Sequence, residues 1–250
     1  MKLSSDLIKS LATYTANLKD DVSIVLQKGS HEKREELVTF LEDVCSVSEK
    51  LNFEESDLCT SNRSSISFTL FSNGMNSGIT FSGIPGGHEF NSLVLAILQL
   101  GGADLKLDDN IKSMICNINE KLQFEVFISL DCHICPEVVQ SLNKFAIVNE
   151  NISCEMIDGG LFPDIVKERD IQGVPTVFLN GEFFSSGKTE ISKIISKLGD
   201  RIDTSEKSQE FELETQDTVV IGAGPAGISA SIYLARKGLK VALVTENIGG

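Results

Sequence analysis

The fold of this chain is decided by one stretch, Phe124-Glu-Val-Phe-Ile-Ser-Leu-Asp-Cys132-His-Ile-Cys135-Pro136. Residues 124–130 are rich in β-branched and aromatic side chains and predict a buried strand. The apolar spacing of residues 136–146 predicts a helix directly after it. The two cysteines therefore fall at a strand-to-helix turn. The free N–H groups and the positive dipole end of a helix N-terminus favour a thiolate there, so we expect a reaction centre.

The spacing of Cys132 and Cys135 alone allows a dithiol exchange site, half of a zinc site, or two core cysteines. Zinc requires four ligands, and the sequence holds no second C-x-x-C or H-x-x-x-H pair, so a metal site is disfavoured. About forty residues later, Val-Pro175-Thr precedes another predicted strand. This arrangement resembles thioredoxin, in which the residue matching Pro175 is a cis-proline beside the disulfide. The redox interpretation is favoured.

The resulting roles are different for the two cysteines. Cys132, nearer the helix N-terminus and the surface, is expected to attack as the thiolate, and Cys135 to resolve the mixed disulfide. His133 either tunes the thiol or is an exposed spacer. The other cysteines are expected to be small core residues, namely Cys45, Cys59, Cys116 and Cys154.

The composition excludes several classes of function. The chain has 250 residues and a net charge of −14, which argues against nucleic acids and anionic membranes as partners. Its longest apolar run, near residues 93–98, is too short to span a bilayer, and the N-terminus lacks an apolar signal core. Six cysteines with one close pair do not form a secreted disulfide framework. We expect a cytoplasmic protein.

The pattern along the chain predicts two similar α/β halves. In residues 1–101 we expect helices at 6–18, 31–51 and 91–100, with strands at 22–26, 64–71 and 78–81. In residues 102–198 we expect helices at 108–121, 136–146, 162–169 and 190–198, with strands at 124–130 and 152–157, a strand and a turn within 173–181, and a returning strand at 182–185. The first half has Gln27-Lys-Gly29 where the second has C-x-x-C. It is therefore predicted to be redox-inert.

Residues 199–216 are acidic and lack periodicity, which predicts an exposed linker. Residues 217–250 then contain a strand, Gly222-Ala-Gly224-Pro225-Ala226-Gly227, a helix, and a strand with Glu246 at its end. This is a G-x-G-x-x-G nucleotide motif in its full context, with Glu246 where a ribose-binding carboxylate belongs. The residues Gly224-Pro225-Ala226-Gly227 resemble the FAD-binding versions of this motif. Residues 217–250 are long enough for one β-α-β element only, which is the start of an incomplete FAD-binding domain.

Glu89, in Gly83-Ile-Pro85-Gly-Gly-His-Glu89-Phe, has two interpretations. The simpler one is a solvated carboxylate that caps the next helix dipole. In the other, Glu89 faces the dithiol across a cleft between the halves and handles protons.

These motifs together resemble one family over all 250 residues, that of the bacterial alkyl hydroperoxide reductase F subunit, the peroxiredoxin reductases. The resemblance implies two tandem thioredoxin-like domains followed by the truncated start of an FAD-binding Rossmann-type domain. It also implies electron flow from NADH to FAD, through the flavoprotein part, to a Cys132–Cys135 redox disulfide and then a peroxiredoxin. A homodimer is expected for the full-length protein. The alternative function is a docking module with structural cysteines.

Overall fold

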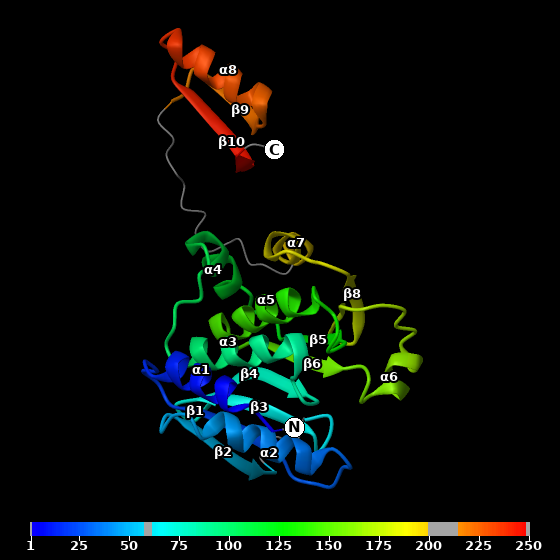
Figure 1. The fold of residues 1–250 in the computed structure, drawn as a ribbon. Helices are drawn as coiled ribbons and strands as arrows, with labels where there is room; N and C mark the ends of the chain where they lie inside the picture. The colour runs from blue at the N-terminus through cyan, green and yellow to red at the C-terminus, as the bar shows by residue number, and fades with distance from the viewer. Residues whose placement is uncertain (1, 58–61, 200–214, 249–250) are drawn as a thin grey trace. The chain divides into compact units, whose positions relative to one another are not determined.

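The computed structural model describes residues 2–57, 62–199 and 215–248. It divides into two compact units, residues 1–203 and 204–250. The first unit is built on one eight-stranded sheet, and the second on a two-stranded sheet with a helix (Figure 1). Cys59 and residues 200–214 of the predicted linker lie outside the described residues.

The first unit contains two successive sets of helices and strands. The first set is α1 (Ser5–Thr15), β1 (Val22–Gln27), α2 (Arg34–Cys45), β2 (Leu51–Ser56), β3 (Ser67–Ser72), β4 (Met75–Ser82), the single 3-10 turn η1 (Gly87–Glu89) and α3 (Phe90–Leu100). The second is α4 (Asp109–Cys116), β5 (Leu122–Ile128), α5 (Cys135–Val148), β6 (Ile152–Asp158), α6 (Pro163–Glu168), β7 (Thr176–Leu179), β8 (Glu182–Ser186) and α7 (Ile191–Lys197). Both sets follow the α/β alternation that the sequence predicts.

The strand order shows how the two halves are joined. It runs β2-β1-β3-β4-β6-β5-β7-β8, so each half repeats the same local order of four strands. The halves meet where β4 pairs in parallel with β6, in a register that matches Ile79 with Cys154 and Ser82 with Ile157. The main chain therefore forms one continuous sheet across the predicted boundary at residue 101, and the residue limits of the two halves stay a prediction.

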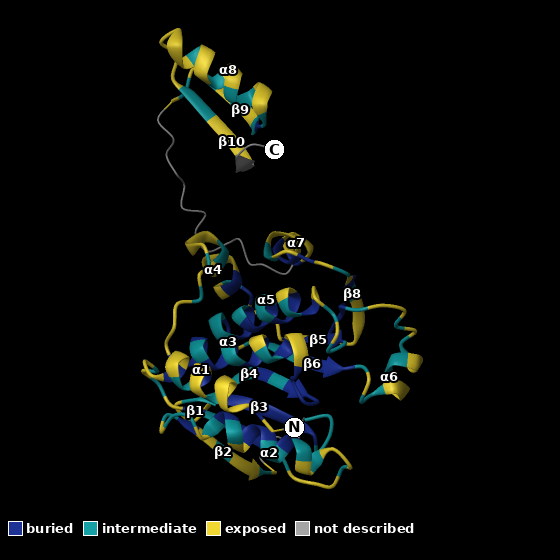
Figure 2. Cartoon of the chain, in the orientation of Figure 1, coloured by how far each residue is buried: buried dark blue, intermediate teal, exposed yellow. Residues whose placement is uncertain are grey.

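One apolar core extends under both halves. Helices α3 and α5 cover one face of the central strands (Figures 1 and 2). Alternate residues of these strands, such as Phe81 and Phe124, belong to the buried core. Phe145 of α5 is fully buried at the same face. Because burying apolar surface is the main favourable term in folding, this shared core makes the halves a single packing unit.

The sequence analysis was wrong at one place in the first half. The helix expected over 31–51 is shorter, Arg34–Cys45, and Leu51–Ser56 forms the parallel edge strand β2 beside β1. Most of this strand is polar, and Leu51 is its one buried residue. An edge strand held mainly by backbone hydrogen bonds needs no regular apolar alternation, so its sequence carries a weak signal.

The second face of the sheet carries an ion-pair network across the joint. Glu125 and Glu155 are register partners on β5 and β6, so their carboxylates lie side by side. Arg63 donates to both, with Glu155 held at 2.9 Å by Nε and by Nη2. Arg169 holds Glu125 from the other side at 2.6 Å. Arg63 belongs to the first half, so this guanidinium links the halves through charges that are largely buried.

Replacing Arg63 by methionine is expected to lower the free energy of unfolding by about 3 kcal/mol. The change leaves two partly buried carboxylates adjacent with one cation fewer, and breaking a buried ion pair costs about that much. Urea denaturation gives the free energy. The control is Lys50→Met, which removes the exposed 2.8 Å pair with Asp21 and is expected to have little effect. Equal losses in the two variants would contradict a special role for the network.

The second unit is a single β-α-β element. Strands β9 (Thr218–Ala223) and β10 (Val241–Ile248) are parallel, and α8 (Pro225–Arg236) connects them. This matches the strand, glycine turn, helix and second strand that the sequence predicts. Among the described residues of the whole chain, no helix combines the length and apolar character that crossing a membrane requires.

Candidate active site

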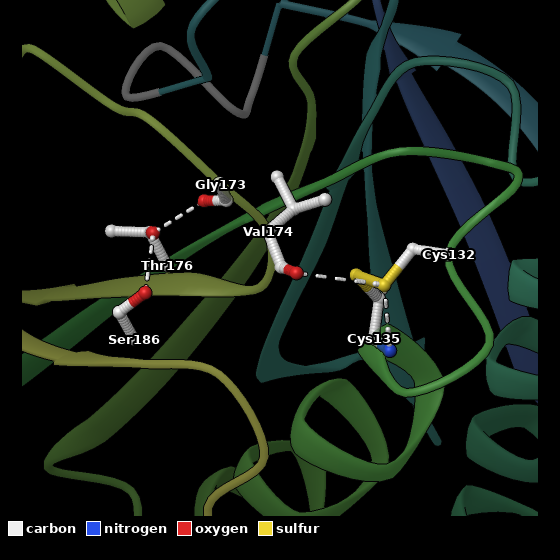
Figure 3. The surroundings of a disulfide bond; sticks show 6 residues. All are labelled: Cys132, Cys135, Gly173, Val174, Thr176 and Ser186. Atoms are coloured by element: carbon white, nitrogen blue, oxygen red, sulfur yellow. Dashed lines mark hydrogen bonds between the residues drawn. A yellow bond between two sulfur atoms is a disulfide. The ribbon is translucent and has the colours of Figure 1, made fainter.

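A disulfide joins Cys132 and Cys135 at the turn between β5 and α5 (Figure 3). The strand ends at Ile128, and the N–H of Cys132 donates to the carbonyl oxygen of Ser129 at 3.0 Å, which turns the chain. Helix α5 begins at Cys135, with Pro136 in its first turn. Proline suits this position because its missing N–H would have no partner inside the helix. The strand–C-x-x-C–helix turn that the sequence predicts is confirmed.

The two sulfur atoms lie in different surroundings. Cys135 is fully buried, whereas Cys132 is partly accessible to solvent. The backbone N–H of Cys135 donates to Cys132 Sγ at 3.1 Å. In the reduced protein this donor and the N-terminal dipole of α5 would both favour a thiolate at Cys132. The geometry therefore gives one accessible sulfur with anion stabilisation and one sheltered sulfur behind it.

A second loop lies against the disulfide. The peptide bond between Val174 and Pro175 is cis, as the resemblance to thioredoxin implies, and the carbonyl oxygen of Val174 lies 3.8 Å from Cys132 Sγ (Figure 3). Two contacts hold this loop: Thr176 Oγ1 donates to the Gly173 carbonyl at 2.7 Å, and the Gly187 N–H donates to the Pro175 carbonyl at 2.8 Å. A fixed backbone carbonyl beside Cys132 is an acceptor for a thiol proton.

The half without the C-x-x-C also reaches this turn. Gly87 has φ +53, and a Cβ atom there would approach the Leu130 carbonyl oxygen to 2.7 Å, so only glycine fits. The next residue, His88, donates its N–H to the same carbonyl at 3.4 Å. The His88 ring meets the ring of His133, between the two cysteines, with centroids 4.3 Å apart.

Glu89, the following residue, is completely buried. It is not the solvated carboxylate of the simpler interpretation, and as the N-cap of α3 its side chain makes no capping hydrogen bond. Neither carboxylate oxygen has a well-formed hydrogen bond among the described residues. Burial raises the pKa of Glu89 to about 7, and the neighbouring Ser92 hydroxyl acts in the opposite direction. Such a carboxyl group exchanges a proton near neutral pH.

The structure thus brings the predicted catalytic residues to one region of the first unit, whereas the predicted cofactor-binding residues belong to the second unit. Cys132, Cys135 and the Pro175 loop meet directly, and Glu89 lies in the same turn as His88, which contacts His133. The sequence analysis missed the contact of His88 with His133, because no local pattern signals a contact between residues so far apart. Of the other cysteines, Cys154 is buried as expected, whereas Cys116 is exposed, contrary to the core role predicted for it.

The glycine motif in the second unit forms a compact turn of its own. Gly222 has φ +97, and a Cβ atom on Gly227 would come within 1.8 Å of the Gly222 carbonyl oxygen. Gly224 caps α8 and Pro225 follows in its first turn. Glycines here let the helix start close to the strand and leave its N–H groups open, so the turn fits a dinucleotide pyrophosphate. The Glu246 side chain lies outside what the structure describes.

These features define the class of protein. A C-x-x-C disulfide at a helix N-terminus, facing a cis-proline in this α/β topology, defines a thioredoxin-fold protein, here with the start of a nucleotide-binding domain after it. Family comparison agrees: the thioredoxin domain matches residues 122–199, and the pyridine nucleotide-disulphide oxidoreductase domain matches residues 216–249.

Individual relatives give the family. The alkyl hydroperoxide reductase F subunit of Staphylococcus aureus is 42% identical over 99% of this chain and 47% of its own length. An NADH dehydrogenase of Bacillus subtilis is 39% identical over 100% of this chain and 48% of its own length. The crystal structure of the NTD N/C domain of the alkylhydroperoxide reductase AhpF from Enterococcus faecalis matches with a TM-score of 0.72 and 32% identity, covering 78% of this chain and 99% of that one.

The chain belongs to the family of the alkyl hydroperoxide reductase F subunit. It spans about half the length of the curated relatives it matches. A protein disulfide oxidoreductase from Aeropyrum pernix, at 20% identity and a TM-score of 0.68, shares the doubled fold.

Because Glu89 is buried, we expect the free energy of unfolding to depend on pH, and we expect Glu89→Gln to remove this dependence. The pKa of the Glu89 carboxyl group is about 7 in the folded protein, against 4.5 normally. Its contribution to the free energy of unfolding is therefore fully present below pH 4.5 and is lost as the pH rises through 7. The loss is about 3 kcal/mol. The free energy of unfolding of the oxidised protein is measured by urea denaturation between pH 4.5 and 8. Over this range the difference between variant and wild type should shift by that amount in favour of the variant.

The control for this measurement is Glu137→Gln. Glu137 is exposed and pairs with Lys188 at 2.8 Å, so this variant loses the same formal charge without removing a buried carboxylate. If the stability curves of Glu89→Gln and the wild type stay parallel across this pH range, the Glu89 carboxyl group does not ionise in the interior with a raised pKa.

Proposed function

We propose that this chain carries the thiol–disulfide relay of a peroxiredoxin reductase. Reduced Cys132 and Cys135 pass two electrons to the disulfide of an alkyl hydroperoxide reductase C-type peroxiredoxin, which supports the reduction of hydroperoxides. The observation that carries this proposal is the unequal cysteine pair: an accessible Cys132 sulfur that accepts the Cys135 N–H, with a buried Cys135 behind it. The proposal is also supported by the family to which the chain belongs.

The exchange has two steps. The Cys132 thiolate attacks one sulfur of the peroxiredoxin disulfide, whose S–S bond breaks and releases the other sulfur as a thiolate. Cys135 then loses its proton and attacks Cys132 Sγ, which breaks the mixed disulfide and releases the second peroxiredoxin thiolate. The Cys132–Cys135 disulfide re-forms, so the relay is oxidised by two electrons and the peroxiredoxin is reduced by two.

In this scheme Glu89 is the group that takes the proton from the dithiol. Cys135 is fully buried, so its thiol is shielded from bulk water when the partner is bound. Glu89 is buried in the turn whose neighbour His88 contacts His133, and its pKa of about 7 suits a group that both accepts and returns a proton at neutral pH. The half without the C-x-x-C thereby contributes to the chemistry.

The nucleotide motif indicates the source of the electrons. Gly222, Gly224, Pro225, Ala226 and Gly227 would hold the pyrophosphate of FAD, and Glu246 would bind its ribose. When bound in the full-length protein, FAD supplies electrons taken from NADH. These pass to the Cys132–Cys135 disulfide through the flavoprotein part of the same protein, which we expect to be a homodimer.

Exchange through Cys132 gives a direct test. The chain is reduced, freed of reductant and mixed with the oxidised peroxiredoxin, and both proteins are alkylated and analysed by mass spectrometry. Cys132→Ser should lower the rate at least about a hundredfold because it removes the nucleophile. Cys135→Ser should accumulate a mixed disulfide on Cys132. Cys116→Ser, which removes an exposed thiol elsewhere, should leave the rate unchanged.

An unchanged rate in Cys132→Ser would sink the enzymatic proposal. It would favour instead a docking module in which both cysteines are structural.

The proton role of Glu89 predicts a change in the pH profile. Resolution of the mixed disulfide should slow on Glu89→Gln, by about a hundredfold or more near pH 7, because general-base catalysis is lost. The difference should shrink as the pH rises and hydroxide removes the proton. Single-turnover exchange between pH 6 and 9 measures this. A rate profile that keeps the wild-type shape would leave Glu89 as a buried structural carboxylate.

A further inference from the structure

Two of the three histidines in the chain meet at the dithiol, and they come from different halves. The rings of His88 and His133 lie with centroids 4.3 Å apart and planes at 61°, an edge-to-face contact. His133 directly follows Cys132 in the chain. Both histidines are exposed, so the ring pair lies at the surface beside the accessible cysteine.

The backbone under His88 is fixed against the same turn. Gly87 packs against the Leu130 carbonyl so closely that a Cβ atom would approach its oxygen to 2.7 Å, and the His88 N–H donates to that oxygen at 3.4 Å. Residue 89, next along the chain, is completely buried. The imidazole of His88 therefore projects from an anchored position, whereas His133 sits on a short exposed turn between the cysteines.

We propose that His88 is a positioning residue of the dithiol, acting through His133. Its ring holds the His133 ring against loop 83–89 and so keeps that ring away from Cys132 Sγ, where an incoming disulfide must approach. Without His88 the His133 side chain is free to take rotamers that cover the sulfur. This inference rests on the proposed exchange chemistry of Cys132 and adds a residue from the half that has no C-x-x-C.

The test uses oxidised glutathione, a small disulfide that needs no protein docking surface. The Cys132 thiolate attacks one glutathione sulfur and releases one glutathione thiolate. Cys135 then attacks Cys132 Sγ and releases the second, so one Cys132–Cys135 disulfide forms for each glutathione disulfide reduced. Alkylation followed by peptide mass spectrometry measures the oxidation state of Cys132 and Cys135 separately from that of the other cysteines.

His88→Ala should slow disulfide formation by about two- to tenfold, the size of one edge-to-face contact. His88→Phe keeps a ring at the same position and should restore most of the rate. In a His133→Ala background, His88→Ala should have no further effect, because the ring that it positions is absent. Such coupling is what a double-mutant cycle isolates. His31→Ala, which removes the third histidine in the loop after β1, is the matched control.

Three results would overturn the inference: an unchanged rate in His88→Ala, a His88→Phe rate as low as that of His88→Ala, or equal effects of His88→Ala with and without His133. Urea denaturation of each variant separates loss of the fold from loss of positioning. Because glutathione replaces the peroxiredoxin, failure of the peroxiredoxin proposal would leave this result intact. If Cys132→Ser abolishes exchange while the His88 variants keep the wild-type rate, the proposed relay stands and only the positioning role of His88 is disproved.

Discussion

The parallel pairing of β4 with β6 is the constraint on which the site depends. β6 also pairs in parallel with β5, so three adjacent strands run in the same direction and end at one edge of the sheet. Loop 83–89 leaves that edge after β4, and the C-x-x-C turn leaves it after β5. Crevices at the carboxyl ends of parallel strands are where such sheets place their reactive groups. An antiparallel joint would send the two loops to opposite ends.

The same joint gives buried carboxylates different partners on its two faces. On one face, Glu125 and Glu155 lie side by side, and the guanidinium of Arg63 compensates for both. On the face that carries the core, Glu89 is buried, and desolvation raises its pKa. A buried carboxyl group without an ion pair is left able to change its charge. The carboxylates at the joint therefore differ in their partners, since all three are shielded from water.

The sequence predicts what is local. The C-x-x-C turn, the proline beside it and the glycine turn of the second unit are encoded by neighbouring residues whose backbone requirements are specific. Strand β2 escaped prediction because an edge strand with polar side chains has no periodic signal. The burial of Glu89 and its neighbour's contact with His133 could not be predicted either. Both follow from the β4–β6 register, which joins residues more than seventy positions apart.

The first half is best understood through what it supplies to the second. Both halves have the same strand order, but after β1 the first has Gln27-Lys-Gly29 in place of the cysteine pair. One dithiol suffices for the proposed two-electron exchange, so a second pair would add nothing to it. Its loop after β4, in contrast, adds groups that a single thioredoxin-like unit lacks: an anchored imidazole at the surface and a carboxyl group of raised pKa beneath it. The duplicated fold thus places the cysteine pair on one half and the His88 ring and the Glu89 carboxyl group on the other, and the continuous sheet holds the two halves in register.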